Sequence, residues 1–520
     1  MKVFENATFI SCEDGNRFFS VLVEDKGKIV FVGDAIPEEY KKAERINLQS
    51  KCVVPAFVDA HIHFLSYALF NNTFDVRNAR NYDEVISIIQ SYDIANPAEK
   101  ILIGFGFSEH SIAEKKAMDR HILDKAIKKP LLLVKYDGHA ALCNSALLKK
   151  LPSSVFAQRG VDSESGWLLN DAFFHGVNYI SSLISPYRLF KNLINANHSM
   201  AKKGIGLIDT AEGVGFPLDA DIHTMRFASL GLPLSYRIYQ QTMDVKKVVS
   251  RKNNFIGGCF KTALDGCFGS EDAALLKPYS NNPHNSGVLF YNQETVNNFV
   301  REANRANLQV ALHAIGDAAV EQALQAYEFA LNDYPREDHR HIIIHAFLMT
   351  ENQIERTGKM GIHISTQPAL ISWAQEPMEY IETLLGTRTQ NMLNLNKMLQ
   401  HNITIAAGSD APCSLPDPMF SIYAACKHPI DGYGISVLDA LKMHTNWGAK
   451  LSFDEKERGT LTVGKCADFV LLDKNPLTTA IAEIPNITIE KFYLNGNEYR
   501  DDIKTPYDLV KASIKNKLFS

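Results

Sequence analysis

The sequence predicts an α/β protein, a (β/α)8 TIM barrel that carries a small β-sandwich domain built from both termini and an insertion after barrel strand 1. Two observations lead to this prediction. Short apolar runs alternate with amphipathic helical patterns along the middle of the chain, which is typical of repeated βα units and a parallel sheet. Short β-rich runs bounded by turn residues also stand at both ends, which indicates one domain assembled from the two termini.

The terminal runs lie at 2–10, 18–23 and 28–32, and again at 459–464, 467–472 and 487–494. The barrel runs have four to eight residues each and lie at 53–60, 205–210, 234–239, 255–262, 308–312, 341–344, 361–366 and 403–407. Eight is the number of strands that closes a TIM barrel. Helical patterns fill the gaps between them, for example at 293–306 and 318–331.

The gap between the first two barrel strands is too long for one helix and has its own strand pattern at 131–136. We therefore read it as an insertion near the barrel mouth. The predicted division is a composite β-sandwich domain at 1–54 and 455–520, a barrel at 55–64 and 204–454, and an insertion at 65–203.

Composition narrows the class of protein. The 520 residues include 54 Lys+Arg and 59 Asp+Glu, a net charge of −5 that disfavours general affinity for nucleic acid. Hydrophobic residues make up 46% and charged residues 22%, an ordinary globular mix that argues against disorder. The chain shows neither a signal-peptide pattern nor an apolar run of about 18 residues, so we expect a cytoplasmic protein without a membrane partner. Its eight cysteines form no CxxC pair, which favours reduced, buried thiols.

Polar residues follow several of the predicted barrel strands, where catalytic groups of such barrels gather. His61 and His63 end the first strand and, being two residues apart, share one side, so both imidazoles can reach one metal ion. His313, His345 and Asp410 follow the fifth, sixth and eighth strands. Each histidine alone is more often a satisfied polar residue at the start of a loop. Together, nitrogen and carboxylate donors at four strand ends favour a metal site.

Lys261 ends the fourth strand. Burial of a charged and unpaired lysine costs roughly several kcal/mol, so the protonation state of Lys261 needs an explanation. One alternative is an ordinary salt bridge with a carboxylate such as Asp265. The other is a lysine deprotonated by burial and carbamylated by carbon dioxide, whose two oxygens would bridge a pair of metal ions.

These motifs resemble those of the amidohydrolase superfamily, and within it the metal-dependent amidohydrolases of the YtcJ-like and N-substituted formamide deformylase group. The order and spacing of the motifs cover nearly the whole chain. The matching segments are 54–64, 137–145, 261–266, 313–317, 345–346, 408–412 and 459–468. Ala56 stands where glycine is usual and Cys466 where an apolar residue is common, but neither is a ligand in the family.

The resemblance implies a binuclear metal centre with Zn2+ as the expected ion. His61, His63 and Asp410 would hold the more buried ion, and His313 and His345 the outer one. A carbamate on Lys261, derived from carbon dioxide, would bridge the two. Imidazole and carboxylate ligands suit manganese and iron as well, so the sequence leaves the metal open. Asp410 would act as the general base that takes a proton from the attacking water.

Two interpretations of His139, within the segment 137–145, have equal weight. It could donate a hydrogen bond to the substrate carbonyl and so be catalytic, or it could only stabilise its own turn. The function predicted from these features is hydrolysis of an amide or related C–N bond in a small molecule such as an N-acyl or N-formyl amine.

Three alternatives to an amide hydrolase stay open: a deaminase or an ester hydrolase of the same superfamily, and a catalytically inactive regulatory barrel. Lys261, and the Ala-Ile-Gly-Asp that follows His313, disfavour the mononuclear deaminase. The inactive barrel is disfavoured because every expected ligand position is filled. A homodimer is the base-rate expectation for the assembly.

Overall fold

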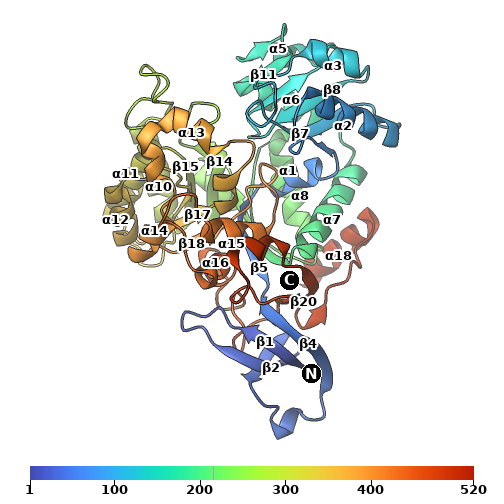
Figure 1. Cartoon of the computed structure of the whole chain (residues 1–520), viewed down its shortest axis with the longest axis vertical. Coiled ribbons are helices and arrows are strands. Elements are labelled where there is room, and N and C mark those ends of the chain that lie inside the picture. Colours follow the sequence, from blue (N-terminus) through green and yellow to red (C-terminus); the bar gives the residue numbers. More distant parts are fainter. Residues whose placement is uncertain (215, 520) are drawn as a thin grey trace.

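The computed structural model describes residues 1–214 and 216–519, which contain three β-sheets. Figure 1 shows the N-terminal strands at one end of the long axis and the sheet of the insertion at the other, with the barrel between them. Among the helices described, none is long and apolar enough to cross a membrane.

An eight-stranded parallel sheet forms the barrel and confirms the predicted fold class. Its strands follow one another in chain order: β5 (Phe57–Ile62), β12 (Ile205–Glu212), β13 (Ser235–Gln240), β14 (Phe255–Ala263), β15 (Gln309–Ala314), β16 (Ile342–His345), β17 (His363–Thr366) and β18 (Ile405–Ala407). The last strand lies beside the first. The N–H of Asp410, just after β18, donates to the carbonyl of His61 in β5 (2.8 Å), which links the two edges at the barrel mouth.

The first predicted strand is wrong in one respect, because the structure divides 53–60 between two sheets. Val53–Pro55 ends β4 (Glu44–Pro55), which belongs to the terminal sheet, and β5 of the barrel begins at Phe57. The chain changes sheet at Ala56, whose N–H donates to the carbonyl of Asp468, whereas that of Phe57 donates to Gly204. Both segments are buried, so hydropathy alone gives no boundary between them.

The terminal sheet has seven strands in the order β21-β20-β19-β4-β1-β2-β3, and so takes strands from both ends of the chain. They are β1 (Lys2–Ile10), β2 (Phe18–Asp25), β3 (Lys28–Gly33), β4, β19 (Phe469–Leu472), β20 (Ile489–Leu494) and β21 (Asn497–Glu498). The C-terminal helix α18 (Pro506–Phe519) leaves this sheet. It packs against α7 (Pro186–Lys202) and α8 (Ala220–Ala228) beside the barrel.

The insertion has a six-stranded sheet in the order β10-β11-β9-β8-β7-β6. The predicted strand at 131–136 is β8 (Leu131–Lys135), and the other strands are β6 (Phe74–Asp75), β7 (Leu102–Phe107), β9 (Ala140–Cys143), β10 (Val161–Asp162) and β11 (Trp167–Leu169). Its helices are α2 (Tyr82–Ala95), α3 (Arg120–Ala126), α4 (Ser145–Leu148), α5 (Ser153–Phe156) and α6 (Asn170–Ser182). Helix α1 (Phe64–Phe70) and α7 pack on each other where the insertion joins the barrel.

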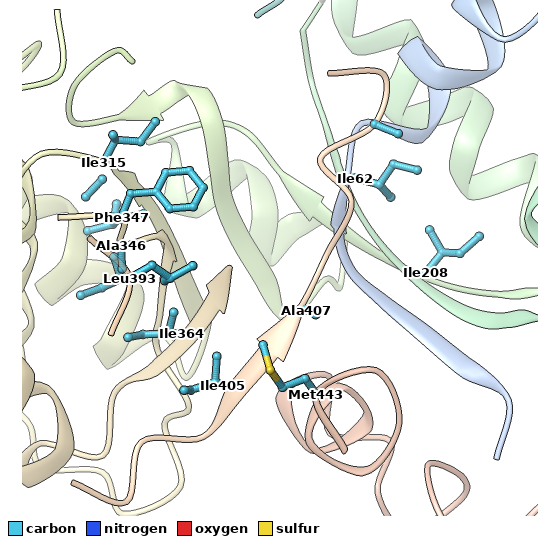
Figure 2. Close-up of a cluster of buried hydrophobic side chains, with 14 of the residues drawn as sticks. Ile62, Ile208, Ile315, Ala346, Phe347, Ile364, Leu393, Ile405, Ala407 and Met443 are labelled. Carbon is cyan, nitrogen blue, oxygen red and sulfur yellow. The ribbon is translucent and has the colours of Figure 1, made fainter. Parts of the chain in front are cut away.

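Helices surround the barrel and bury the outward side chains of its strands. After α8 they are α9 (Val245–Ser250), α10 (Gln293–Arg305), α11 (Asp317–Asp333), α12 (Glu351–Lys359), α13 (Met378–Leu385), α14 (Leu395–Gln400), α15 (Pro418–Cys426), α16 (Val437–Met443) and α17 (Asn446–Leu451). Ile405 and Ala407 of β18 point outward, and Figure 2 shows Met443 of α16 beside Ala407. The intervening Ala406 belongs to a separate cluster inside the barrel, as the two-residue period of a strand requires.

Candidate metal centre

Six buried polar side chains meet at the carboxyl ends of the barrel strands. They form two groups that share Cys259: His61, His63, Cys259 and Asp410 in one, and Cys259, His313 and His345 in the other. Within each group the ligand atoms lie within 4.8 Å of one another. The structure therefore brings together the four histidines and the aspartate expected as metal ligands, and it adds a cysteine that the sequence had not indicated.

Asp410 faces the His61–His63 pair. Its Oδ1 atom lies 3.3 Å from Nε2 of His61 and 3.4 Å from Nε2 of His63. Asp410 adopts a φ of 54°, and the turn before it is held because the Ser409 N–H donates to Oδ1 of Asp59 (2.9 Å). Within residues 1–214 and 216–519, Oδ1 of Asp410 is buried with no hydrogen-bond partner. A buried carboxylate oxygen without a donor is costly, and a bound cation would satisfy it.

Outer contacts orient two of the imidazoles. Nδ1 of His63 lies 3.2 Å from the carbonyl oxygen of Ala211, and Nδ1 of His345 lies 2.6 Å from Oε1 of Gln367. These oxygens can only accept, so in each ring Nδ1 carries the proton and donates it. The Nε2 lone pairs are thereby left to face the cluster, which is the usual arrangement of histidines that bind metals.

His313 presents its other nitrogen to the cluster. Its Nε2 donates to the carbonyl of Gly266 (3.2 Å), and its Nδ1 lies 3.4 Å from Sγ of Cys259. Nε2 of His345 lies 3.6 Å from the same sulfur. The second group therefore also offers imidazole lone pairs directed inward.

The protonation of three of these histidines suits a metal site. Burial lowers the pKa of His61, lowers that of His313 well below its usual value, and lowers that of His345 to about 4. These rings are therefore neutral near pH 7 and can donate electron pairs. Burial also opposes the charged forms of Asp410 and His63, but the contacts of Asp410 with His61 and His63 outweigh it. The pKa of the carboxyl falls well below its usual value, and that of His63 rises.

Lys261, the predicted bridging ligand, contacts a backbone carbonyl in the structure. Its side chain is exposed, and its Nζ donates to the carbonyl oxygen of Gly213. Asp265, the partner expected for an ordinary salt bridge, instead accepts the backbone N–H groups of Ala274, Ile315 and Gly316 at 2.8–3.0 Å. The structure thus pairs Lys261 with neither the histidine cluster nor Asp265.

An open cavity leads from the cluster. It has about 720 Å³ of empty volume, part of it open to solvent, and reaches His313, His345 and Asp410. Most of its wall is apolar, with Ile315, Phe347, Ile371, Trp373, Ile381 and Met392 among the lining residues. The insertion contributes Asp137 and His139 to the same wall. The His139 N–H also donates to Oδ1 of Asp137 (3.0 Å), so this residue both shapes its turn and faces the cavity.

One acidic residue interrupts the apolar wall. Glu376 lines the cavity and accepts a hydrogen bond from the Tyr136 hydroxyl (2.9 Å). Burial raises the pKa of Glu376 to about 7, so this carboxyl is partly protonated near neutral pH. It could either donate to or accept from a polar group of a ligand.

A second cavity, of about 600 Å³, lies on the side of His63 and Glu212. Phe105, Phe173, Phe174 and Phe260 line it. The ring of Phe260 packs against His63, with centroids 5.0 Å apart, and against His139 at 5.8 Å. Space for apolar groups therefore exists on both sides of the histidine cluster.

Sequence reasoning missed Cys259, Gln367 and Asp59. A signal existed for Cys259, because it precedes Lys261 by two residues and so would share its strand face. Gln367 directly follows β17, as Asp410 follows the last barrel strand at a short distance. Asp59 is buried within the apolar run of β5 and binds the turn of another strand, which no local pattern indicates.

The chain matches known proteins over most of its length. Residues 44–499 match the Amidohydrolase family. YtcJ of Bacillus subtilis, which carries the name amidohydrolase, is 26% identical over 95% of this chain and 99% of its own length. N-substituted formamide deformylase of Arthrobacter pascens is 22% identical over 94% of this chain and 96% of its own.

A solved structure, an uncharacterized metal-dependent hydrolase from Pyrococcus furiosus, has the same fold. It superposes with a TM-score of 0.74 at 24% identity and covers 92% of this chain and 100% of its own. The family match spans far more than half of the sequence and includes every strand of the barrel. This chain is therefore a hydrolase that belongs to the amidohydrolase family.

Proposed function

We propose that this protein uses bound divalent metal ions to hydrolyse an amide or related C–N bond in a small molecule with an apolar substituent. One observation supports the proposal above all others. Four buried histidines converge with Asp410 at the end of a largely apolar cavity, and no described residue donates a hydrogen bond to Oδ1 of Asp410. Such a cavity with a few convergent polar groups is typical of a small-molecule active site.

The residues present fit a pair of ions. His61, His63 and Asp410 would hold one, and His313 and His345 the other. Neutral imidazole and carboxylate suit Zn2+, our expected metal, and also manganese or iron. When bound, such ions lower the pKa of a water molecule and polarise a carbonyl group. The carbamate on Lys261 stays a prediction, and it would require Nζ to leave the carbonyl of Gly213.

Asp410 is the proposed general base. Its low pKa keeps it ionised near neutrality, and Oδ1 has no hydrogen-bond partner among the residues that the structure describes. It would accept a proton from the attacking water and deliver it to the leaving nitrogen. His139 lines the cavity beside the cluster and would donate a hydrogen bond to the carbonyl oxygen of the substrate.

The apolar wall favours substrates with an apolar group attached to the scissile bond, such as N-acyl or N-formyl amines. The relative named N-substituted formamide deformylase makes the formamides the first compounds to test. A deaminase or an ester hydrolase is the competing activity within the family. A cytoplasmic homodimer that binds a small molecule rather than nucleic acid stays a prediction from the sequence.

The test is a panel of N-formyl amines, N-acyl amines, N-acyl amino acids, amino heterocycles and esters, incubated with the zinc-loaded protein. Amine release from an amide or formamide, lost on chelation and restored by metal, is the expected result. Ammonia release from heterocycles alone would favour a deaminase. A protein that binds no metal and turns over nothing on the panel would contradict the proposal and favour a regulatory barrel.

A further inference from the structure

We propose that Cys259 is a metal ligand shared by the two ion positions, in the place that the family resemblance assigns to Lys261. This inference rests on the proposed metal-dependent function and concerns which side chain of β14 joins the two ions. Cys259 is the one residue common to both groups of ligand atoms, and it is buried, with 5% of its surface exposed.

The sulfur lies close to three of the four histidines. Sγ is 3.2 Å from Nε2 of His61, 3.4 Å from Nδ1 of His313 and 3.6 Å from Nε2 of His345. His61 belongs to the first group and the other two to the second. A ligand that joins two ions needs this position between the groups.

The polar atoms around Sγ need a further binding partner. His313 and His345 donate their protons outward to Gly266 and Gln367, so each directs a lone pair at Sγ. A thiol has one proton and can satisfy only one of these lone pairs. The other lone pair receives no proton from this thiol. Oδ1 of Asp410 nearby also has no hydrogen-bond donor within the described part of the chain. Metal ions between the nitrogens, the sulfur and the carboxylate would satisfy all of them.

The backbone of β14 explains why Cys259, and not Lys261, lies in the cluster. Gly257 and Gly258 have φ values of 107° and 127°, and a Cβ on Gly257 would lie 1.9 Å from the carbonyl oxygen of Ala311. These glycines let the strand reach the barrel interior at Cys259. Phe260 then adopts a φ of 40°, after which Lys261 points to the carbonyl of Gly213.

The pairing of β14 with β15 changes at the same place. Gly258 lies opposite Leu312, and the next paired residue, Ala263, lies opposite His313, so residues 259–262 bulge out of the ladder. At this bulge Cys259 joins the cluster, and Lys261 contacts the carbonyl of Gly213. Cys259 and Lys261 are therefore alternative candidates for the ligand that joins the two ions.

On coordination, the sulfur of Cys259 would exchange its proton for a metal ion. The S–H bond breaks, the proton goes to solvent water, and the thiolate forms a bond to the metal with no change in oxidation state. Thiolate is a strong ligand for zinc, with a Zn–S distance of about 2.3 Å against about 2.0–2.1 Å for imidazole nitrogen. These distances are far enough apart for X-ray absorption to distinguish the two kinds of ligand.

The test is zinc-edge X-ray absorption on the wild-type holoenzyme, which needs no variant to fold. We expect a sulfur scatterer at about 2.3 Å in the zinc shell. The same measurement on Cys259→Ser should lose the sulfur, whereas Lys261→Ala should keep it together with its zinc. Cys413→Ser is the matched control, because Cys413 lines the cavity beside the cluster but belongs to neither ligand group found among the described residues.

Replacement of zinc by cobalt gives an independent readout. A sulfur-to-cobalt charge-transfer band in the near ultraviolet should be present in the wild type and in Cys413→Ser, and absent in Cys259→Ser. Zinc bound only by nitrogen and oxygen in the wild type, with metal lost in Lys261→Ala, would overturn the role of Cys259 and leave the metal-dependent hydrolase standing. A wild-type protein that binds no metal at all would overturn both.

Discussion

Oδ1 of Asp410, after the last barrel strand, lies 3.3 Å from Nε2 of His61 in the first. The contact forms where the barrel closes, because the N–H of Asp410 also donates to the carbonyl of His61 (2.8 Å). Closure of the sheet and assembly of the candidate site therefore depend on the same two residues. An amide in place of the Asp410 carboxylate would keep the backbone link and remove only the charge.

We accordingly expect Asp410→Asn to fold normally but to lose its general base and a metal ligand. Loss of a positioned general base alone lowers kcat by about 10²–10⁴-fold. Amine release by the zinc-loaded variant and its zinc content would be measured together, with circular dichroism as the check on folding. Asp439→Asn, on the surface of α16, is the control and should behave as the wild type. Unchanged turnover in Asp410→Asn would exclude Asp410 as the base.

Gln367 should affect metal affinity through His345. Its Oε1 accepts the Nδ1 proton at 2.6 Å and so directs Nε2 to the cluster. Removal of such an outer partner typically weakens metal binding by about 10–100-fold, and we expect this loss in Gln367→Ala, measured by competition with a chelator. Gln325→Ala removes an exposed glutamine of α11 and should leave the affinity unchanged. Equal affinities in both variants would show that His345 needs no such orientation.

The strand ends could be predicted because each ligand follows an apolar run long enough to identify a strand. His61, His313, His345 and Asp410 all emerged this way, and the structure brings them together. The alternation of strands and helices, with short β-rich runs at both ends, was likewise sufficient for the barrel and for a sheet shared by the termini.

The features that the sequence did not predict depend on backbone conformation and on contacts between distant residues. A regular strand would turn Cys259 and Lys261 to the same face. The separation of the two side chains accompanies positive φ values at Gly257, Gly258 and Phe260, and a phenylalanine rarely adopts one. The boundary at Ala56 lies inside one uninterrupted apolar run and is set by contacts with Gly204 and Asp468.

Trp373 should contribute to recognition of apolar substrates. It lines the larger cavity, and its ring packs edge-on against Tyr136 with centroids 4.9 Å apart. Full burial of a large apolar group is worth about 1.5–3 kcal/mol, so Trp373→Ala should lower kcat/KM by about 10-fold or more for amides with bulky apolar groups. The smallest formamides should be affected least, and Trp373→Phe should retain most of the activity. A uniform loss across substrates of every size would indicate a structural role instead.

Asp209 should make stability depend on pH. It is buried inside the barrel, accepts a hydrogen bond from the Ser452 hydroxyl through Oδ2, and leaves Oδ1 without a partner among the residues described. Burial raises its pKa from 3.8 to about 8. Between these values the unfolded chain has released this proton while the folded chain retains it. The folded state then binds more protons, so the free energy of unfolding falls as pH rises, and the loss is complete above about pH 8.

Asp209→Asn removes this dependence and should keep the bond from Ser452 through its amide oxygen. The melting temperature of the variant relative to wild type should therefore rise between pH 5 and pH 9, a range that spans most of the interval from 3.8 to about 8. Both proteins would be measured with a chelator present, since metal binding has its own pH dependence. Ser452→Ala is the control that removes the hydrogen bond but retains the carboxyl, and it should keep the wild-type trend. A constant difference between Asp209→Asn and wild type across this range would mean that Asp209 ionises normally in the folded protein.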